Sequence, residues 1–176
     1  MILTGEGIHA EVRSGKISIL PFDPDRLNPN SYDFKLGRTL LVYRKRTLDA
    51  RARNSTRSIT LDDDGFELRP NRIYLAHTVE HFSTQHYVPI FFAKSTVARL
   101  GLFVHVTSNL IDIGHRGQWT LQLHAVQPIR IYPDMLIGQA TFWKPRGTIR
   151  LYSGKYQNSR GPIASRLNVV SEKGSR

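Results

Sequence analysis

The chain has 176 residues, of which 40% are hydrophobic and 22% charged, and this composition fits one globular domain with its own core. It contains no cysteine, which excludes disulfides, thiolate metal sites and cysteine nucleophiles. A formal net charge of +11 suits phosphorylated ligands or nucleic acid, whereas no apolar run approaches the roughly 20 residues of a membrane-spanning helix.

The first half of the chain predicts one short helix followed by strands. The N-terminus lacks the basic start and long apolar stretch of a signal peptide, so we expect a cytoplasmic protein. A helix is expected over residues 4–14, because Thr4 can cap it and Ile8 and Val12 lie on one face. Runs rich in β-branched and aromatic residues, bounded by turn residues, then predict strands at 17–19, 32–36, 39–43, 58–61, 66–68 and 73–78.

The second half continues this pattern and contains no strand–helix–strand rhythm. A single helical turn is expected at 96–100, and strands are expected at 88–93, 103–106, 118–126, 129–132 and 137–143. Short strands separated by turns about every ten residues predict an all-β sandwich or barrel. Residues 152–176 are rich in Gly, Ser and Arg, and we expect a mobile C-terminal segment there. The whole chain, 1–176, is interpreted as one domain.

The densest positive charge lies in a polar stretch, residues 44–57. Its cations are Arg44, Lys45, Arg46, Arg51, Arg53 and Arg57. The absence of a strand or helix pattern favours a variable, mobile surface loop. Two alternatives remain open: a surface for nucleic acid or an acidic partner, and a direct contribution to an active site.

A first candidate site combines Lys94, Ser95 and Thr96 with Arg99. An apolar strand leads into a turn that offers one cation and two hydroxyls, and Arg99 follows Ser95 by four residues. If the turn is helical, these groups share a face and suit an oxyanion such as phosphate. The alternative is an ordinary helix start with a surface arginine.

A second candidate is Asp112, which follows Leu110 and Ile111 and precedes Gly114 and Gly117. A half-buried aspartate at a strand end can hold a sugar hydroxyl or activate water. The alternative is an Asx-turn, in which the carboxylate accepts a hydrogen bond from the backbone two residues on.

Alternation over residues 118–125 places the apolar side chains on one face and Gln118, Thr120, Gln122 and His124 on the other. Gln122 can hold a base edge or a water through its amide, but it cannot accept a proton as a general base. The alternative is a polar face turned to solvent or a neighbouring subunit. No P-loop or HExxH motif occurs, and the histidines are too dispersed for a metal triad, so no protein-bound metal site is expected.

Taken together, these motifs resemble the dCTP deaminase family of the dCTP deaminase/dUTPase superfamily. Residues 94–105 resemble R-S-S-x-A-R-L-G-L-x-V-H, and residues 155–166 resemble K-Y-x-x-Q-x-G-x-x-x-S-R. The resemblance covers roughly residues 1–167. It implies a distorted β-barrel of the dUTPase-like type, a homotrimer with active sites between subunits, a nucleotide of the dCTP or dUTP type, and Mg²⁺ carried by the triphosphate.

By position, the resemblance also implies roles for individual residues. Those at the reacting centre would be Ser95, Arg99, Asp112 and Gln122. Those that bind the nucleotide would be Lys94, Thr96, Thr107, Ser108, Asn109, His115, Gln139, Tyr152, Lys155, Tyr156 and Arg160.

The implied activity is hydrolytic deamination of dCTP to dUTP, in which the family uses a glutamate. This chain has Gln122 at that position. Two alternatives therefore stand beside deamination. One is a dUTPase-like pyrophosphatase that releases monophosphate and pyrophosphate, with Asp112 activating the water. The other is a catalytically inactive nucleotide-binding module.

Overall fold

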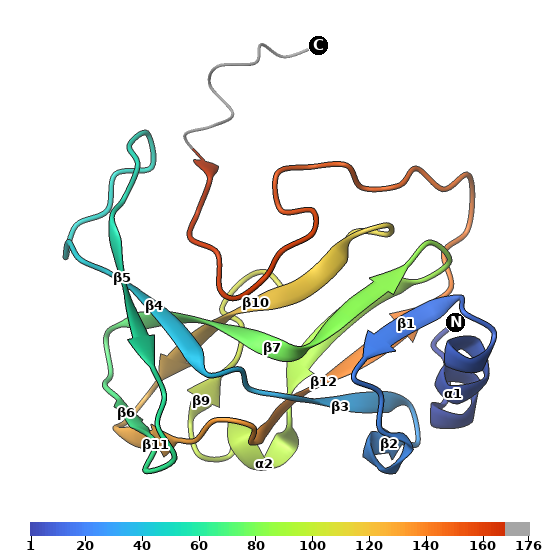
Figure 1. Ribbon diagram of the computed structural model, residues 1–176, viewed down its shortest axis with the longest axis horizontal. Coiled ribbons are helices and arrows are strands. Elements are labelled where there is room, and N and C mark those ends of the chain that lie inside the picture. The colour runs from blue at the N-terminus through green and yellow to red at the C-terminus, as the bar shows by residue number, and fades with distance from the viewer. Residues whose placement is uncertain (168–176) are drawn as a thin grey trace.

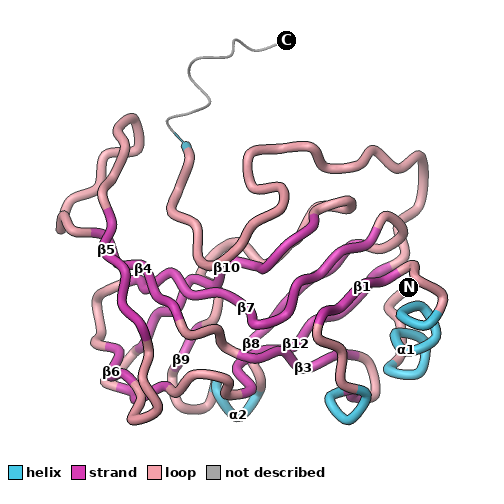
Figure 2. Tube along the Cα trace, in the orientation of Figure 1, coloured by secondary structure: helices cyan, strands magenta, loops and turns pink. Residues whose placement is uncertain are grey.

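The structure, a computed structural model, describes residues 1–167 and consists mainly of antiparallel strands (Figures 1 and 2). The expected all-β fold is therefore confirmed. In chain order, the elements are α1 (Gly5–Arg13), β1 (Ile17–Leu20), η1 (Pro24–Arg26), β2 (Leu27–Asn28), β3 (Ser31–Lys35), β4 (Thr39–Tyr43), β5 (Thr56–Thr60), β6 (Phe66–Leu68), β7 (Ile73–Thr84), β8 (Val88–Ala93), α2 (Ser95–Ala98), β9 (Leu102–Phe103), β10 (Arg116–Ala125), β11 (Ile129–Ile131) and β12 (Leu136–Trp143).

Three sheets enclose an aromatic core. The largest has the order β5-β4-β7-β10-β9, with β1 also paired to β7; a second has the order β2-β3-β12-β8, and β11 pairs with β6. Phe82 stacks on Trp119 with ring centroids 3.9 Å apart, and Phe34 meets Trp119 edge-on at 6.2 Å. These rings come from β7, β10 and β3, so the core ties the two larger sheets together.

Local sequence signals account for most element boundaries. Thr4 caps α1 as expected, because its hydroxyl accepts the Gly7 N–H at 3.2 Å. The expected strands at 39–43, 66–68 and 88–93 agree with β4, β6 and β8. Within residues 1–167, no helix is long and apolar enough to cross a bilayer.

The expected strand at 73–78 was too short, since β7 continues to Thr84. The second half of β7 contains the fully buried Glu80, which interrupts any apolar pattern. Arg26 forms an ion pair with Glu80, and the backbone N–H of Lys35 donates to it at 3.1 Å. The strand can therefore continue through Glu80 because Arg26, from a distant segment, pairs with the buried carboxylate.

Two other boundaries differ from expectation. The strand expected at 103–106 is only the two-residue β9, and the chain leaves the sheet after Phe103. The expected loop at 44–57 ends earlier, because β5 begins at Thr56 and pairs with β4 as a hairpin. Of the C-terminal segment expected at 152–176, residues 168–176 lie outside the described residues, and the remainder lies over β10 (Figure 1).

Candidate functional site

A cavity of about 650 Å³ lies between β10, the loop before it and the C-terminal segment. This volume lies within the range of small-molecule sites. Residues expected from the sequence to bind nucleotide supply much of its lining: Ser108, Asp112, His115, Gln122, Tyr152, Lys155 and Tyr156. The structure therefore brings together residues that are up to 48 positions apart in the sequence.

Residues 152–167, here called the arm, pack against β10 because of Gly117. This glycine has a φ of 136°, and a Cβ there would lie 2.6 Å from the backbone nitrogen of Ser159. The Gly161 N–H donates to the Gln118 Oε1 at 2.6 Å, and the Ile163 N–H donates to the Thr120 Oγ1 at 3.1 Å. The polar face of β10 thus provides the hydrogen-bond partners that the arm's backbone requires.

Gln122 lies on the same face of β10, two residues after Thr120, and lines the cavity. Its backbone N–H donates to the Val104 carbonyl at 3.0 Å, which fixes its place in the sheet. Its side chain forms no hydrogen bond within residues 1–167, unlike that of Gln118. The Gln122 amide therefore offers a donor and an acceptor to a ligand.

His115 is held in one tautomer by the arm. Its Nε2 lies 3.1 Å from the Tyr156 carbonyl oxygen, which can only accept, so we assign the ring proton to Nε2. In the neutral ring Nδ1 is then an acceptor, and it is buried without a partner among residues 1–167. Burial lowers the pKa of His115, although the Tyr156 hydrogen bond and the Asp112 charge oppose this. His115 is therefore neutral at pH 7 and retains a free lone pair.

Two further polar groups, on residues that line the cavity, lack protein partners within residues 1–167. The buried Trp119 Nε1 has no acceptor within the described residues. The exposed Asp112 carboxylate likewise makes no hydrogen bond or ion pair there; instead, its backbone carbonyl accepts the His115 N–H at 3.1 Å. Buried polar groups in proteins are normally hydrogen-bonded, so the unpaired His115 Nδ1 and Trp119 Nε1 favour a polar ligand, whereas the exposed Asp112 carboxylate is open to solvent or to a ligand.

The candidate phosphate turn does not line this cavity. Ser95 and Thr96 on α2 and Arg99 directly after it are exposed. α2 lies at the lower edge of Figure 1, whereas the arm lies at the upper edge. Lys94 precedes α2, and its ammonium forms an ion pair with Asp33 on β3. The structure therefore places the expected site residues in two groups, one in the cavity and one around α2.

Four other expected residues also lie outside the cavity. Gln139 accepts a hydrogen bond from the Ser31 hydroxyl at 3.4 Å, and the Asn109 carbonyl accepts the Phe91 N–H at 3.1 Å. Thr107 and Arg160 are exposed.

Sequence reasoning missed several residues of the cavity wall, of which Tyr43 is the clearest. Its hydroxyl accepts the Ser165 N–H at 3.1 Å and so anchors the far end of the arm. The two residues are 122 positions apart, and no local pattern marks such a contact.

Comparison with known proteins identifies similar chains. A family model described as "dCTP deaminase-like" matches residues 2–145. A protein of Hathewaya histolytica named "dCTP deaminase, dUMP-forming" is 44% identical over 168 residues, covering 95% of this chain and 97% of that protein. A "dCTP deaminase" of Rhodopirellula baltica is 47% identical over 161 residues, covering 90% of this chain and 80% of that protein.

Among solved structures, the 2'-deoxycytidine 5'-triphosphate deaminase of Agrobacterium tumefaciens has a similar fold, with a TM-score of 0.64 at 20% identity. The match covers 80% of this chain and 47% of that one, so the chain spans about half of that larger protein.

Proposed function

The chain belongs to the dCTP deaminase-like family, and we propose that it binds dCTP and deaminates it hydrolytically to dUTP. It is a nucleotide enzyme of the dCTP deaminase/dUTPase hydrolase class. The observation that carries the proposal is the cavity, which gathers Asp112, His115 and Gln122 beneath an arm bearing Lys155. In this assignment, the base and sugar lie on β10 and the triphosphate lies towards the arm.

Mg²⁺ is proposed to enter with the nucleotide. Residues 1–167 contain no group of three His, Cys, Asp or Glu side chains that could hold a metal. Without such a protein site among these residues, we propose that phosphate oxygens hold the ion, as is common for Mg²⁺. The ion would neutralise phosphate charge. Asp112 and Lys155 would then orient the sugar and the phosphates, respectively.

The separation of the site into two groups supports a homotrimer with active sites between subunits. Exposed apolar side chains lie near α2: Leu100 is 54% exposed, Phe103 50% and Val106 47%. Burying them against another subunit would be favourable. We propose that this contact brings Ser95 and Arg99 of one subunit to the cavity of the next.

Mixed subunits provide a test of this shared site. Arg99→Ala and Asp112→Asn should each inactivate the enzyme. Co-assembled, they should regain about a quarter of the wild-type activity, because random pairing restores that fraction of sites. Recovery is impossible if each chain carries a complete site. Light scattering should give the mass of three chains.

Deamination adds water to C4 of cytosine, and the water proton must finally reach the departing ammonia. Gln122 cannot accept this proton, but its amide can hold the water. The neutral His115 offers Nδ1 as the acceptor, with Nε2 fixed by the Tyr156 carbonyl. We assign to His115 the transfer of the proton from water to the leaving amine.

A second candidate is hydrolysis at the α-phosphate, which needs no base at C4. It is favoured by Gln122 and by the unpaired carboxylate of Asp112 at the cavity, where it could activate water. Several relatives are named "dCTP deaminase, dUMP-forming".

The experiment is to incubate the protein with Mg²⁺ and either dCTP or dUTP, and to resolve the products by anion exchange. dUTP and ammonia from dCTP would support deamination. Monophosphate and pyrophosphate from dUTP, without deamination of dCTP, would support the second candidate. A raised melting temperature without any product would refute both reactions and leave a binding module.

A further inference from the structure

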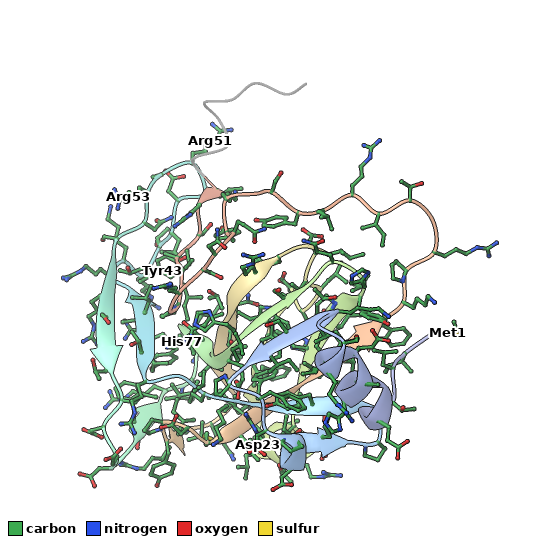
Figure 3. The ribbon with its side chains drawn as sticks, turned by 45° about the vertical axis from the view of Figure 1, so that its right-hand side comes forward. Met1, Asp23, Tyr43, Arg51, Arg53 and His77 are labelled. Atoms are coloured by element: carbon green, nitrogen blue, oxygen red, sulfur yellow. The ribbon has the colours of Figure 1, made fainter. Side chains whose placement is uncertain are left out.

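The hairpin between β4 and β5 carries a concentration of positive charge separate from the cavity. Residues 44–57 contain six cations and one carboxylate, for a net charge of +5 out of +11 for the chain. The hairpin tip projects from the sheet, and Arg51 and Arg53 extend from it (Figures 1 and 3). We refer to residues 44–57 as the arginine hairpin.

The cations of the arginine hairpin form no ion pair with a carboxylate of residues 1–167. The opposite end of the same two strands differs: there Arg38 pairs with Asp63 at 3.0 Å and with Asp134 at 3.2 Å. Charge is therefore segregated along the hairpin. Surfaces that serve solubility alone usually mix both signs, because like charges repel one another.

The tip is also shaped by its own hydrogen bonds. The Arg51 N–H donates to the Asp49 carboxylate at 2.8 Å, and the Asn54 side-chain amide donates to the Asp49 carbonyl at 2.8 Å. The Asp49 N–H in turn donates to the Asn54 Oδ1 at 3.1 Å. The hairpin's one carboxylate, that of Asp49, therefore accepts a backbone hydrogen bond within the turn and forms no ion pair with a guanidinium. Arg51 and Arg53 lie in a turn whose backbone is held by these hydrogen bonds.

We propose that the arginine hairpin binds the phosphodiester backbone of nucleic acid. Five of its six cations are arginines, whose planar forks hold phosphate oxygens in pairs. Tyr43, which directly precedes the arginine hairpin, accepts the Ser165 N–H with its hydroxyl and so anchors the arm. Because these contacts are made to phosphates, which are the same at every nucleotide, we expect binding that is independent of sequence. This function does not depend on the reaction in the cavity.

The test is fluorescence anisotropy with a labelled 20-nucleotide single strand of mixed sequence, titrated with the full-length protein between 50 and 200 mM salt. Six phosphate contacts would give a log–log slope of about −4 per chain, a loss of about 300-fold over this range. The double substitution Arg51→Gln/Arg53→Gln should reduce the slope by about 1.4.

The matched control is Arg13→Gln/Arg146→Gln, which removes the same charge from exposed sites elsewhere. It should leave the slope unchanged. Equal losses in the two double variants would overturn the proposal, because only net charge would then matter. Binding of poly-glutamate of equal charge as tightly as the oligonucleotide would also overturn it, in favour of a general acidic partner. Unchanged melting temperatures would show that both variants fold.

Discussion

Gln122→Glu is the substitution that most directly tests the chemistry of the cavity. The two side chains have nearly the same shape, so the packing of β10 should be preserved. The Gln122 side chain makes no hydrogen bond within residues 1–167, so no existing contact is lost. The substitution therefore changes little except that it adds a titrating carboxylate to the wall of the cavity.

The size of the effect follows from the setting of that carboxylate. Apolar side chains form the nearby wall, among them Ile73, Leu75, Phe91 and Trp119. Desolvation there should raise the pKa of the new Glu above its usual value of about 4.3, towards the range in which a carboxylate is an effective general base. Positioned acid–base groups contribute about 10²–10⁴-fold, or about 3–5 kcal/mol of barrier; this is the upper limit of the expected increase in dCTP deamination, because His115 already supplies part of the proton transfer.

The assay is release of ammonia from dCTP in the presence of Mg²⁺, with kcat and KM measured separately. Most of the gain should appear in kcat, since the water is activated only during the reaction. Gln122→Leu is the matched control; it removes the amide and should give no gain. If Gln122→Glu binds dCTP with wild-type affinity but shows no increase in kcat, the cavity does not place C4 beside β10, and the reasoning is wrong.

Three further predictions follow from the same contacts. Replacing His115 by Phe should lower kcat for deamination by about 10²–10⁴-fold with little change in KM, and an unaltered kcat would refute its assignment as proton acceptor. Burial lowers the pKa values of His77, His105 and His115 below 6.5, so the unfolded chain binds more protons in acid; melting temperatures should therefore fall as the pH drops below about 6.5, and a flat profile from pH 8 to 5 would contradict this. Gly117→Ala should displace the arm at Ser159 and weaken nucleotide binding while near-native circular dichroism persists, whereas unchanged affinity would show that the arm is not part of the site.

Local patterns predicted strands well because most strand positions alternate between core and surface. β10 is an example: the alternation that predicted Trp119 inside and Gln122 outside is confirmed. The pattern failed where burial depends on a partner distant in sequence. In the sequence, Glu80 interrupts the strand pattern. Its ion pair with Arg26, 54 residues away, and the hydrogen bond from the Lys35 N–H explain why β7 continues past it.

The cavity could be predicted from sequence only in part. The motif around Asp112 and Gln122 is compact, and the structure places both in the cavity. The arm's contacts with Gln118, Thr120 and Tyr43 depend on closure of the fold over long sequence distances, and nothing in the local composition marks them. The tautomer of His115 could likewise not be predicted from the sequence, since it is set by the backbone carbonyl of Tyr156 rather than by a side chain.

The arm contacts both His115 and the polar face of β10. Its carbonyl at Tyr156 fixes the proton on His115, and its N–H groups occupy Gln118 and Thr120. With those two side chains engaged by the arm, Gln122 is the residue on that face of β10 that lines the cavity and whose side chain makes no hydrogen bond among residues 1–167. A substitution that lifts the arm would therefore change the protonation of His115 and the choice of ligand-binding residues together. The Gly117→Ala variant should accordingly lose both nucleotide affinity and the lowered pKa of His115, which NMR titration of the imidazole can follow. Loss of affinity with the His115 pKa still lowered would separate the two effects and refute this coupling.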